Sequence, residues 1–584
     1  MVGREVRPAA AAAAAFLALL ASGGCRGAAV KPNILLILID TLRADHLHCY
    51  GYPRETSPAL DELASRGALF EEAIAAAPWT LPSAMSLLTG RIPSRHRVEN
   101  DTLRLPSSIP LLPGVLREAG YATSAVVSHI YVSFPFGFDR GFDHFDDFGL
   151  SRNYRFEAGL EPRATAVTDR ALAQIRALKG RPFFLLVHYF DPHWDYAPPA
   201  PFDRRFAKPY RGKVTGSYQS IADYIDPGVR LAPEDRQHLL DLYDGEIAYA
   251  DSEIGRLLRG LAAAGLSERT VVVVTSDHGE EFKEHNSMGH GRNLYDEVLK
   301  VPLIIAPPGE GRRARRIREQ VRSIDLFPTL CRMAGGEVPS GVEGEDLGPL
   351  LSGKEGPSRA AVTETIRFDA YRKAFRQGGK KLILNLESNR RELYDLTKDP
   401  SESFNLWPER REEALAMEQD LLARVNMFSG GWNLRWSSDG RPHHFSGFIE
   451  TEGLFTDVLP LFAEEGRHRV VRGRRLDFDL PGVTRGGGLC FRVDPPEARV
   501  AFVLTVDDRE DPGRVRVGGD RAVPPTVPFS FGGALRSEIF RRPPYRAGEE
   551  VAYFVWKNPA DAPGDSVELE DALRQRLRSL GYVR

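Results

Sequence analysis

Polar residues that can bind a metal or act on an ester follow directly on three apolar runs. Asp40 ends "NILLILID", Asp191 and His193 lie in "HYFDPHWDY", and Asp277 and His278 lie in "TSDHGEE". Carboxylate oxygens and imidazole nitrogens are ligands that zinc and manganese accept. A single Asp after a strand is a common turn or cap residue. Its recurrence at equivalent strand ends instead favours one shared site.

A fourth candidate is Thr80 in "PWTLPSAMSLLTG", a turn that leads into a short helical pattern. Pro82 suits the first helical turn and Gly90 suits the helix end, which puts Thr80 at the N-terminus of the helix. Free N–H groups and the helix dipole favour an anion there. Thr80 is therefore either an N-cap or a nucleophile whose hydroxyl, bound to a metal, attacks a tetrahedral ester centre.

The elements that position these residues are long apolar runs. They read "NILLILID", "TSAVVS", "PFFLLVHYF", "TVVVVTSDHG" and "VPLIIAPPG", and helical patterns such as "SPALDELASRGALF" separate them. Uninterrupted β-branched runs of this length predict strands that are buried on both faces of a sheet. The fold class that follows is α/β, with a predominantly parallel sheet and helices on both faces.

Shifts in composition divide the rest of the chain. We expect a catalytic domain over 30–350 and a small C-terminal α+β subdomain over 355–427. Residues 428–567 are rich in Gly, Pro, Arg and short alternating runs, which predicts an inserted β-rich module. Residues 568–584 have the pattern of an amphipathic C-terminal helix.

The first 25 residues predict export. Two arginines precede an apolar run of about a dozen residues, and small residues lead to Cys25. The run is too short for a stable membrane span, which favours a cleaved signal peptide or a lipoprotein signal that ends in lipidation of Cys25 over a retained N-terminal anchor. We expect a periplasmic or envelope-attached protein, anchored to the membrane if Cys25 is lipidated. The net charge of −3 gives no reason to expect a nucleic-acid partner.

Several motifs together resemble the sulfatases of the alkaline phosphatase superfamily. "PNILLILIDTLRADHLHCYGY" resembles the opening strand and first metal-ligand loop of that family, and "TLPSAMSLLTG" resembles its signature C/S-x-P-S-R-x-x-x-L-T-G. "TSDHGEE", "LYDEVLKVPLIIAPPG", "SIDLFPTL" and "ELYDLTKDPSESFNL" are also similar to family segments. The resemblance implies the alkaline-phosphatase/sulfatase fold over most of residues 32–410 and an ester hydrolase activity.

Two departures from the sulfatase pattern bear on the chemistry. Thr80 and Ala84 stand where sulfatases carry the cysteine or serine that becomes formylglycine and the arginine needed for its maturation. We therefore expect no formylglycine. The pairs Asp40-Thr41 and Asp277-His278 replace the more oxygen-rich sulfatase set, which favours zinc or manganese as the divalent metal over calcium or magnesium.

These departures resemble the threonine-nucleophile branch of the superfamily, which includes nucleotide pyrophosphatases, phosphoethanolamine transferases and lipoteichoic acid synthases. By that resemblance Thr80 is the nucleophile. The implied metal ligands are Asp40, Thr80, Asp277 and His278. His193 and His290 would surround the phosphoryl oxygens or a second metal, and Arg292 would supply a substrate-binding cation.

The expected substrate is an anionic ester of a glycan, a lipid head group or a small molecule. Phosphodiesters, phosphomonoesters and phosphonates are favoured for a hydrolase or transferase with an unmodified threonine. Two alternatives remain: a sulfuric ester hydrolase that works without formylglycine, and a non-catalytic envelope protein that binds glycan on a sulfatase scaffold.

Overall fold

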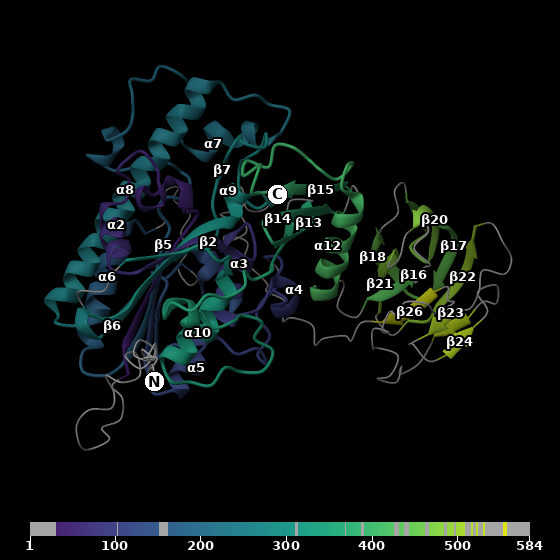
Figure 1. Ribbon diagram of the computed structural model, residues 1–584, viewed down its shortest axis with the longest axis horizontal. Helices are drawn as coiled ribbons and strands as arrows, with labels where there is room; N and C mark the ends of the chain where they lie inside the picture. Colours follow the sequence, from purple (N-terminus) through teal and green to yellow (C-terminus); the bar gives the residue numbers. More distant parts are fainter. Residues whose placement is uncertain are drawn as a thin grey trace, which may run out of the picture.

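The computed structural model shows a large α/β domain, a small antiparallel sheet and a β-sandwich in succession along the chain (Figure 1). The structure describes residues 31–101, 103–150, 162–309, 314–367, 370–386, 390–425, 431–436, 443–461, 466–483, 487–495, 498–507, 515–517, 521–523, 529–531 and 553–557. The expected signal segment, Cys25 and the expected C-terminal helix lie outside these residues.

The central sheet has nine strands among the described residues, and its middle is parallel. The order is β10-β2-β9-β6-β1-β5-β3-β4, with β11 paired to β2, and β9 runs antiparallel to both of its neighbours. The strands are β1 (Asn33–Ile39), β2 (Ala68–Ile74), β3 (Ala122–Val127), β4 (His144–Asp146), β5 (Phe183–Tyr189), β6 (Thr270–Ser276), β9 (Lys300–Ala306), β10 (Arg315–Ile317) and β11 (Val321–Arg322). This confirms the predicted α/β class and the predominantly parallel sheet.

Helices cover both faces of this sheet, because β1 is apolar on both of its sides. Leu36 and Leu38 belong to one buried cluster, and Leu35 and Ile37 belong to the other. The first cluster includes helices α3 (Thr80–Thr89), α5 (Leu112–Glu118) and α10 (Leu326–Met333). The second includes α2 (Pro58–Ser65), α6 (Ala164–Ala177) and α8 (Pro233–Ala263). Each fully buried Leu or Ile side chain contributes about 1.5–3 kcal/mol to this packing.

A four-stranded antiparallel sheet follows the large domain. It contains β12 (Ala361–Arg367), β13 (Ala370–Gln377), β14 (Lys380–Asn385) and β15 (Arg390–Asp395), in that order. One of its faces packs on α12 (Arg411–Arg424) through a cluster that includes Phe375, Leu382 and Leu421. The other face packs on α9 (Asp296–Leu299) through Ala374, Ile383 and Val298. This second contact matters for function because it places β12 and β13 beside the loop that precedes α9.

Two further sheets form a β-sandwich beyond α12. One contains β18 (Leu454–Leu461), β21 (Gly488–Asp494), β16 (Trp432–Trp436), β26 (Tyr553–Lys557), β23 (Val515–Val517) and β24 (Arg521–Val523). The other contains β19 (Arg467–Val471), β20 (Arg475–Val483), β17 (His443–Thr451), β22 (Val500–Val506) and β25 (Phe529–Phe531). Side chains from both sheets share one apolar cluster, with Trp432 and Phe502 in ring contact. The expected β-rich region therefore has β structure where it is described.

Short elements complete the large domain. They are α4 (Pro93–His96), α7 (Tyr218–Ile221), α11 (Gly348–Leu351), β7 (Glu281–Phe282) and β8 (Met288–Gly289). No helix in the described part of the chain combines the length and the apolar character that a membrane span needs.

Candidate active site

The ends of β1 and β6 bring three predicted ligands together. Ile39 lies opposite Ser276 in the parallel pairing of these strands, so Asp40 and Asp277 are neighbours in the loops that follow. The Nε2 atom of His278 lies 3.6 Å from Asp40 Oδ1 and 3.5 Å from Asp277 Oδ2. The three side chains are fully buried and form a group whose ligand atoms all lie within 4.8 Å of one another.

Thr80 faces this group from the other side. It is the first residue of α3, while the N-cap position belongs to Trp79 and carries no side-chain cap. The Thr80 hydroxyl lies 3.3 Å from His278 Nε2. Ser83 donates a hydrogen bond of 2.5 Å to the backbone oxygen of Asp277, which fixes the helix start to the end of β6. The Thr80 hydroxyl is thus directed at the predicted ligands and does not cap the helix.

The donor set fits a divalent metal. Both carboxylate oxygens of Asp40 and the Oδ2 atom of Asp277 are buried without a hydrogen-bond partner, an arrangement that is costly unless a cation compensates it. Donors held about 2.0–2.2 Å from a tetrahedral ion lie roughly 3.3–3.6 Å from one another. The three separations from His278 Nε2 to Thr80, Asp277 and Asp40 fall in this range.

The pKa shifts of Asp40 and His278 also favour a bound cation at this site. Burial, and then repulsion by Asp277 and Glu280, raise the pKa of Asp40 well above its ordinary value. Burial lowers the pKa of His278, so its ring is held neutral. The His278 Nδ1–H donates to the backbone oxygen of Gly279 at 2.9 Å, which leaves the Nε2 lone pair directed at Asp40 and Thr80. A neutral imidazole in this tautomer is the form that binds a metal.

His193 and His290 lie beside the group, as the resemblance implies. The ring centroids of His278 and His290 are 4.5 Å apart, and those of His290 and His193 are 5.0 Å apart. His193 Nδ1 donates to the backbone oxygen of Trp194 at 2.6 Å. His290 Nδ1 lies 2.9 Å from Glu280 Oε1, and the other carboxylate oxygen of Glu280, Oε2, accepts from the Tyr196 hydroxyl. Burial raises the pKa of Glu280 well above its ordinary value, so Glu280 and His290 can share a proton.

Two further histidines at the site were missed in the sequence. His188 is the sixth residue of β5, and its Nε2 atom lies 3.7 Å from Asp40 Oδ2. His129 follows β3, and its Nδ1 atom lies 3.9 Å from the same oxygen. Leu38, His188 and Val127 lie side by side across three strands. Because strand side chains alternate, Asp40, His188 and His129 share the face that α3 covers. A histidine inside an apolar run was the available signal.

The cation at the site comes from the second sheet. Arg367, the last residue of β12, is buried and lies 3.9 Å over the Trp79 ring. It donates to the Tyr131 hydroxyl at 3.1 Å. Its charge contributes to lowering the pKa values of four imidazoles, those of His129, His193, His278 and His290. Arg292, the cation expected from the sequence, lines a neighbouring pocket instead.

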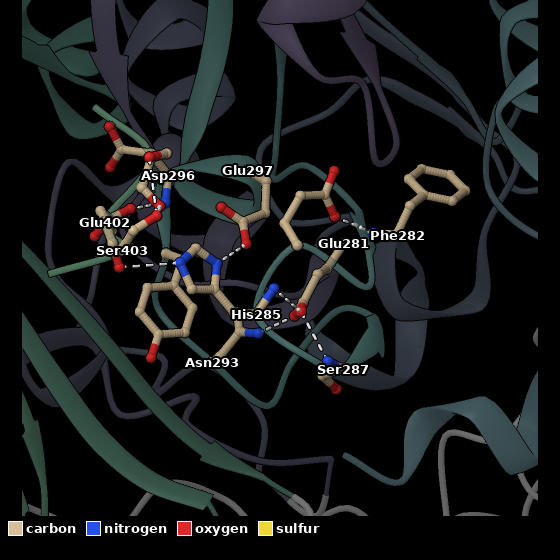
Figure 2. Close-up of polar contacts among 12 residues, drawn as sticks. Glu281, Phe282, His285, Ser287, Asn293, Asp296, Glu297, Glu402 and Ser403 are labelled. Carbon is tan, nitrogen blue, oxygen red and sulfur yellow. Dashed lines mark hydrogen bonds and ion pairs between the residues drawn. The ribbon is translucent and has the colours of Figure 1, made fainter. Parts of the chain in front are cut away.

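A second carboxylate–histidine group lies close by and is satisfied by its own contacts (Figure 2). His285 Nδ1 lies 2.5 Å from Glu297, and Glu281 accepts hydrogen bonds from the backbone N–H groups of His285 and Ser287 and from the Asn293 side chain. The contact with Glu297 raises the pKa of His285 to about 9, so a proton occupies the position a metal would need. This group clamps the loop that carries His290.

The remaining polar residues of the predicted loops have structural contacts. Asp191 pairs with Arg163 at 2.8 Å and accepts from the backbone N–H of Ala164, so it anchors the start of α6. Asp195 accepts from the backbone N–H of Tyr218.

Two protein-family models together match residues 32–427. A family model described as "Sulfatase" matches residues 32–336, and one described as "N-sulphoglucosamine sulphohydrolase, C-terminal" matches residues 284–427. The Delta 4,5-hexuronate-2-O-sulfatase of Bacteroides thetaiotaomicron is 25% identical over 435 residues, which cover 67% of this chain and 87% of that protein.

Similarity extends to proteins that are not named as sulfatases. The multifunctional alkaline phosphatase superfamily protein PehA of Trinickia caryophylli is 27% identical over 399 residues, which cover 55% of this chain and 77% of that protein. In fold, the chain is similar to the phosphonate monoester hydrolase of Agrobacterium radiobacter. The TM-score is 0.56 at 24% identity, and the match covers 67% of this chain and 95% of that structure.

Proposed function

The chain belongs to the sulfatase family of the alkaline phosphatase superfamily and is an ester hydrolase, and from that premise we propose that it cleaves an anionic phosphorus ester through a covalent intermediate on Thr80. Phosphodiesters, phosphomonoesters and phosphonates are the favoured substrates. The observation that carries the proposal is the Thr80 hydroxyl, which lies at the start of α3 and 3.3 Å from His278 Nε2, within the buried donor set.

A divalent metal held by Asp40, Thr80, Asp277 and His278 would lower the pKa of the Thr80 hydroxyl and offset negative charge that develops on the phosphoryl oxygens. The mixed set of carboxylate, hydroxyl and imidazole ligands favours zinc or manganese. Arg367 and His193 are proposed to bind the non-bridging oxygens. The N–H groups at the start of α3 add to this anion site.

The cycle starts with Thr80 as an alkoxide. In the first step its oxygen forms a bond to phosphorus, and the bond from phosphorus to the leaving oxygen breaks. His290 is proposed to give its Nε2 proton to that leaving oxygen, while its Nδ1 atom takes up the proton of the Glu280 carboxyl; the second step reverses this transfer. In the second step water attacks phosphorus and gives a proton to His290, and the bond between phosphorus and Thr80 breaks. Atoms and protons balance over the two steps, and Thr80 is regenerated.

Sulfate ester hydrolysis at the same threonine is a second candidate. The name of the hexuronate sulfatase relative supports it. Thr80 and Ala84 oppose it, because an unmodified threonine forms a stable covalent sulfate that cannot collapse as a formylglycine hydrate does. The names of PehA and of the phosphonate monoester hydrolase are in keeping with phosphorus chemistry on the same fold.

Parallel assays test the proposal. The purified full chain is given 4-nitrophenyl phosphate, bis(4-nitrophenyl) phosphate, 4-nitrophenyl phenylphosphonate and 4-nitrophenyl sulfate, each with zinc, manganese, calcium or a chelator. We expect a phosphorus ester to give the highest kcat/KM, with zinc or manganese. A preference for the sulfate ester would support the second candidate, and full activity in the chelator would contradict the proposed metal.

Export remains part of the proposal. The Arg-flanked apolar run and the small residues before Cys25 support a cleaved or lipidated N-terminus in the periplasm or envelope. Intact-mass measurement of the protein from its native membrane and periplasmic fractions tests this. An unprocessed Met1 on soluble cytoplasmic protein would contradict it.

A further inference from the structure

A pocket of about 980 Å³ lies beside the proposed active site. Its walls come from four segments of the chain: the region of α7, the loop 284–295, strands β13 to β15, and residues 402–403. Figure 2 shows part of this wall, with His285, Asn293 and Ser403 around the clamped loop.

The pocket adjoins the active site through two contacts. Tyr218 lines the pocket and packs on the Trp194 ring, which itself stacks on His290 with ring centroids 4.9 Å apart. Arg292, two residues after His290, lines the pocket, so the same loop carries both residues. A ligand that reaches from the pocket past Trp194 therefore arrives at the imidazole that is proposed to protonate the leaving group.

The acidic side chains of the wall already have partners. Glu284 pairs with Arg43 at 2.7 Å, and Glu402 pairs with Lys381 at 2.8 Å. Glu392 accepts hydrogen bonds from two tyrosine hydroxyls of the wall at 2.7–2.8 Å. These carboxylates are committed to the protein's own contacts.

Arg372 is different, because it is a half-buried cation without an acidic partner in the part of the chain that the structure describes. Its Nε atom is buried and makes no hydrogen bond. Arg372 lies on β13 between Thr365 of β12 and Asn385 of β14, and Asn385 also lines the pocket. Thr365 donates to the backbone oxygen of Gly291, next to His290, so the same strands hold Arg372 close to the active-site loop.

We propose that this pocket binds a second anionic group of the substrate, a carboxylate or sulfate on the leaving-group sugar, and that Arg372 is its principal ligand. An unpaired guanidinium in a pocket is suited to a planar or tetrahedral oxyanion, which it can bind with two parallel hydrogen bonds. Tyr218, which also lines the pocket, offers an aromatic surface for a sugar ring. This inference rests on the proposed function, since it assumes that the ester is cleaved at Thr80.

The test uses matched substrates that differ by one anion. Glucose 1-phosphate and glucuronic acid 1-phosphate isolate a carboxylate; glucosamine 6-phosphate and its 2-N-sulfated form isolate a sulfate. The full chain is compared with Arg372→Gln and with the control Arg318→Gln, whose side chain is 88% exposed and which does not line the pocket. We expect the wild type to prefer at least one doubly charged substrate, and Arg372→Gln to lower that preference in kcat/KM about tenfold. Arg318→Gln should keep the wild-type preference.

The result that would overturn the inference is a preference that stays within twofold of the wild type in Arg372→Gln, or no preference in the wild type. Calorimetric titration of the same sugars separates this result from failure of the proposed function, because it needs no turnover. If no sugar phosphate is cleaved, tighter binding of the doubly charged sugar by the wild type than by Arg372→Gln still supports the pocket. Equal binding by the two proteins rejects it.

Discussion

Two groups, each made of two carboxylates and one histidine, differ in the hydrogen bonds that they leave unmade. Asp40, Asp277 and His278 present buried carboxylate oxygens without hydrogen-bond partners and a neutral ring nitrogen. In the group around His285, the Glu281 carboxylate accepts hydrogen bonds from N–H groups, and the Glu297 carboxylate pairs with the protonated His285 ring. Residue types are alike in the two groups, so it is the buried carboxylate oxygens without hydrogen-bond partners that distinguish a metal site from an ion-pair clamp.

The sharpest test of this comparison is removal of the Thr80 hydroxyl. Thr80→Ala should lower turnover of the best ester at least about a thousandfold, because the variant lacks the oxygen that is proposed to form the covalent intermediate. The free energy of unfolding should change by less than about 1 kcal/mol, since Thr80 is not the N-cap. Steady-state kinetics and thermal unfolding measure the two effects. Activity within tenfold of the wild type would rule out Thr80 as the nucleophile.

Metal content should respond to one group and not to the other. Asp277→Ala removes one of four donors, so bound metal should fall from about one equivalent to almost none, with an activity loss of about a hundredfold or more. Glu297→Gln changes the clamp and should leave the metal content unchanged. Elemental analysis of both purified variants measures this. Metal loss from Glu297→Gln with full occupancy in Asp277→Ala would reverse our assignment of the two groups.

Arg367 is the buried cation that is proposed to bind the substrate beside the Asp40, Asp277 and His278 group. Arg367→Met should lower kcat/KM about a hundredfold, because a buried cation that binds the developing charge is lost. Its charge lowers the pKa values of His193 and His290, so the alkaline limb of the pH–rate profile, which reports loss of the His290 proton, should move to higher pH in the variant. A profile that stays in place would indicate that Arg367 acts only through packing on Trp79.

The smallest expected effect is on the pH dependence of stability. The pKa of His285 is raised to about 9, above its ordinary value near 6.5. Its ion pair with Glu297 therefore contributes fully below about pH 6.5 and is lost as the pH rises through about 9. We expect the free energy of unfolding to fall by about 1–3 kcal/mol across that window, and His285→Gln to flatten this slope. Denaturant titrations from pH 6 to 10 measure it, and an equal slope in the variant would contradict the clamp.

The order of the apolar runs and the polar residues that follow them were enough to predict the α/β fold, and the structure confirms it. They also selected Asp40, Asp277 and His278, while the helix start in "PWTLPSAMSLLTG" selected Thr80 and the family resemblance joined the four into one ligand set. The structure brings these four residues together. Their catalytic and metal-binding roles stay predictions until the variants above are measured.

The other site residues could not be chosen from the sequence, because their roles depend on which strands are neighbours. His188 lies within an apolar run, and it reaches Asp40 because β1 lies between β5 and β6. Arg367 follows Thr80 by 287 positions in the chain. It lies at the active site only because the four-stranded sheet packs against the segment around α9. In the sequence nothing distinguishes Glu280 from the acidic residues around it, because its role depends on the contact with His290.

The sequence by itself determined the secondary structure, the alternation of buried faces and the residues at strand ends, because these follow from local periodicity and backbone preference. The tertiary structure alone decided the order of the strands, which arginine lies beside the proposed active site, and which buried carboxylate oxygens have no hydrogen-bond partner. Those properties depend on contacts between segments hundreds of residues apart, and on the desolvation that such contacts impose on charged groups.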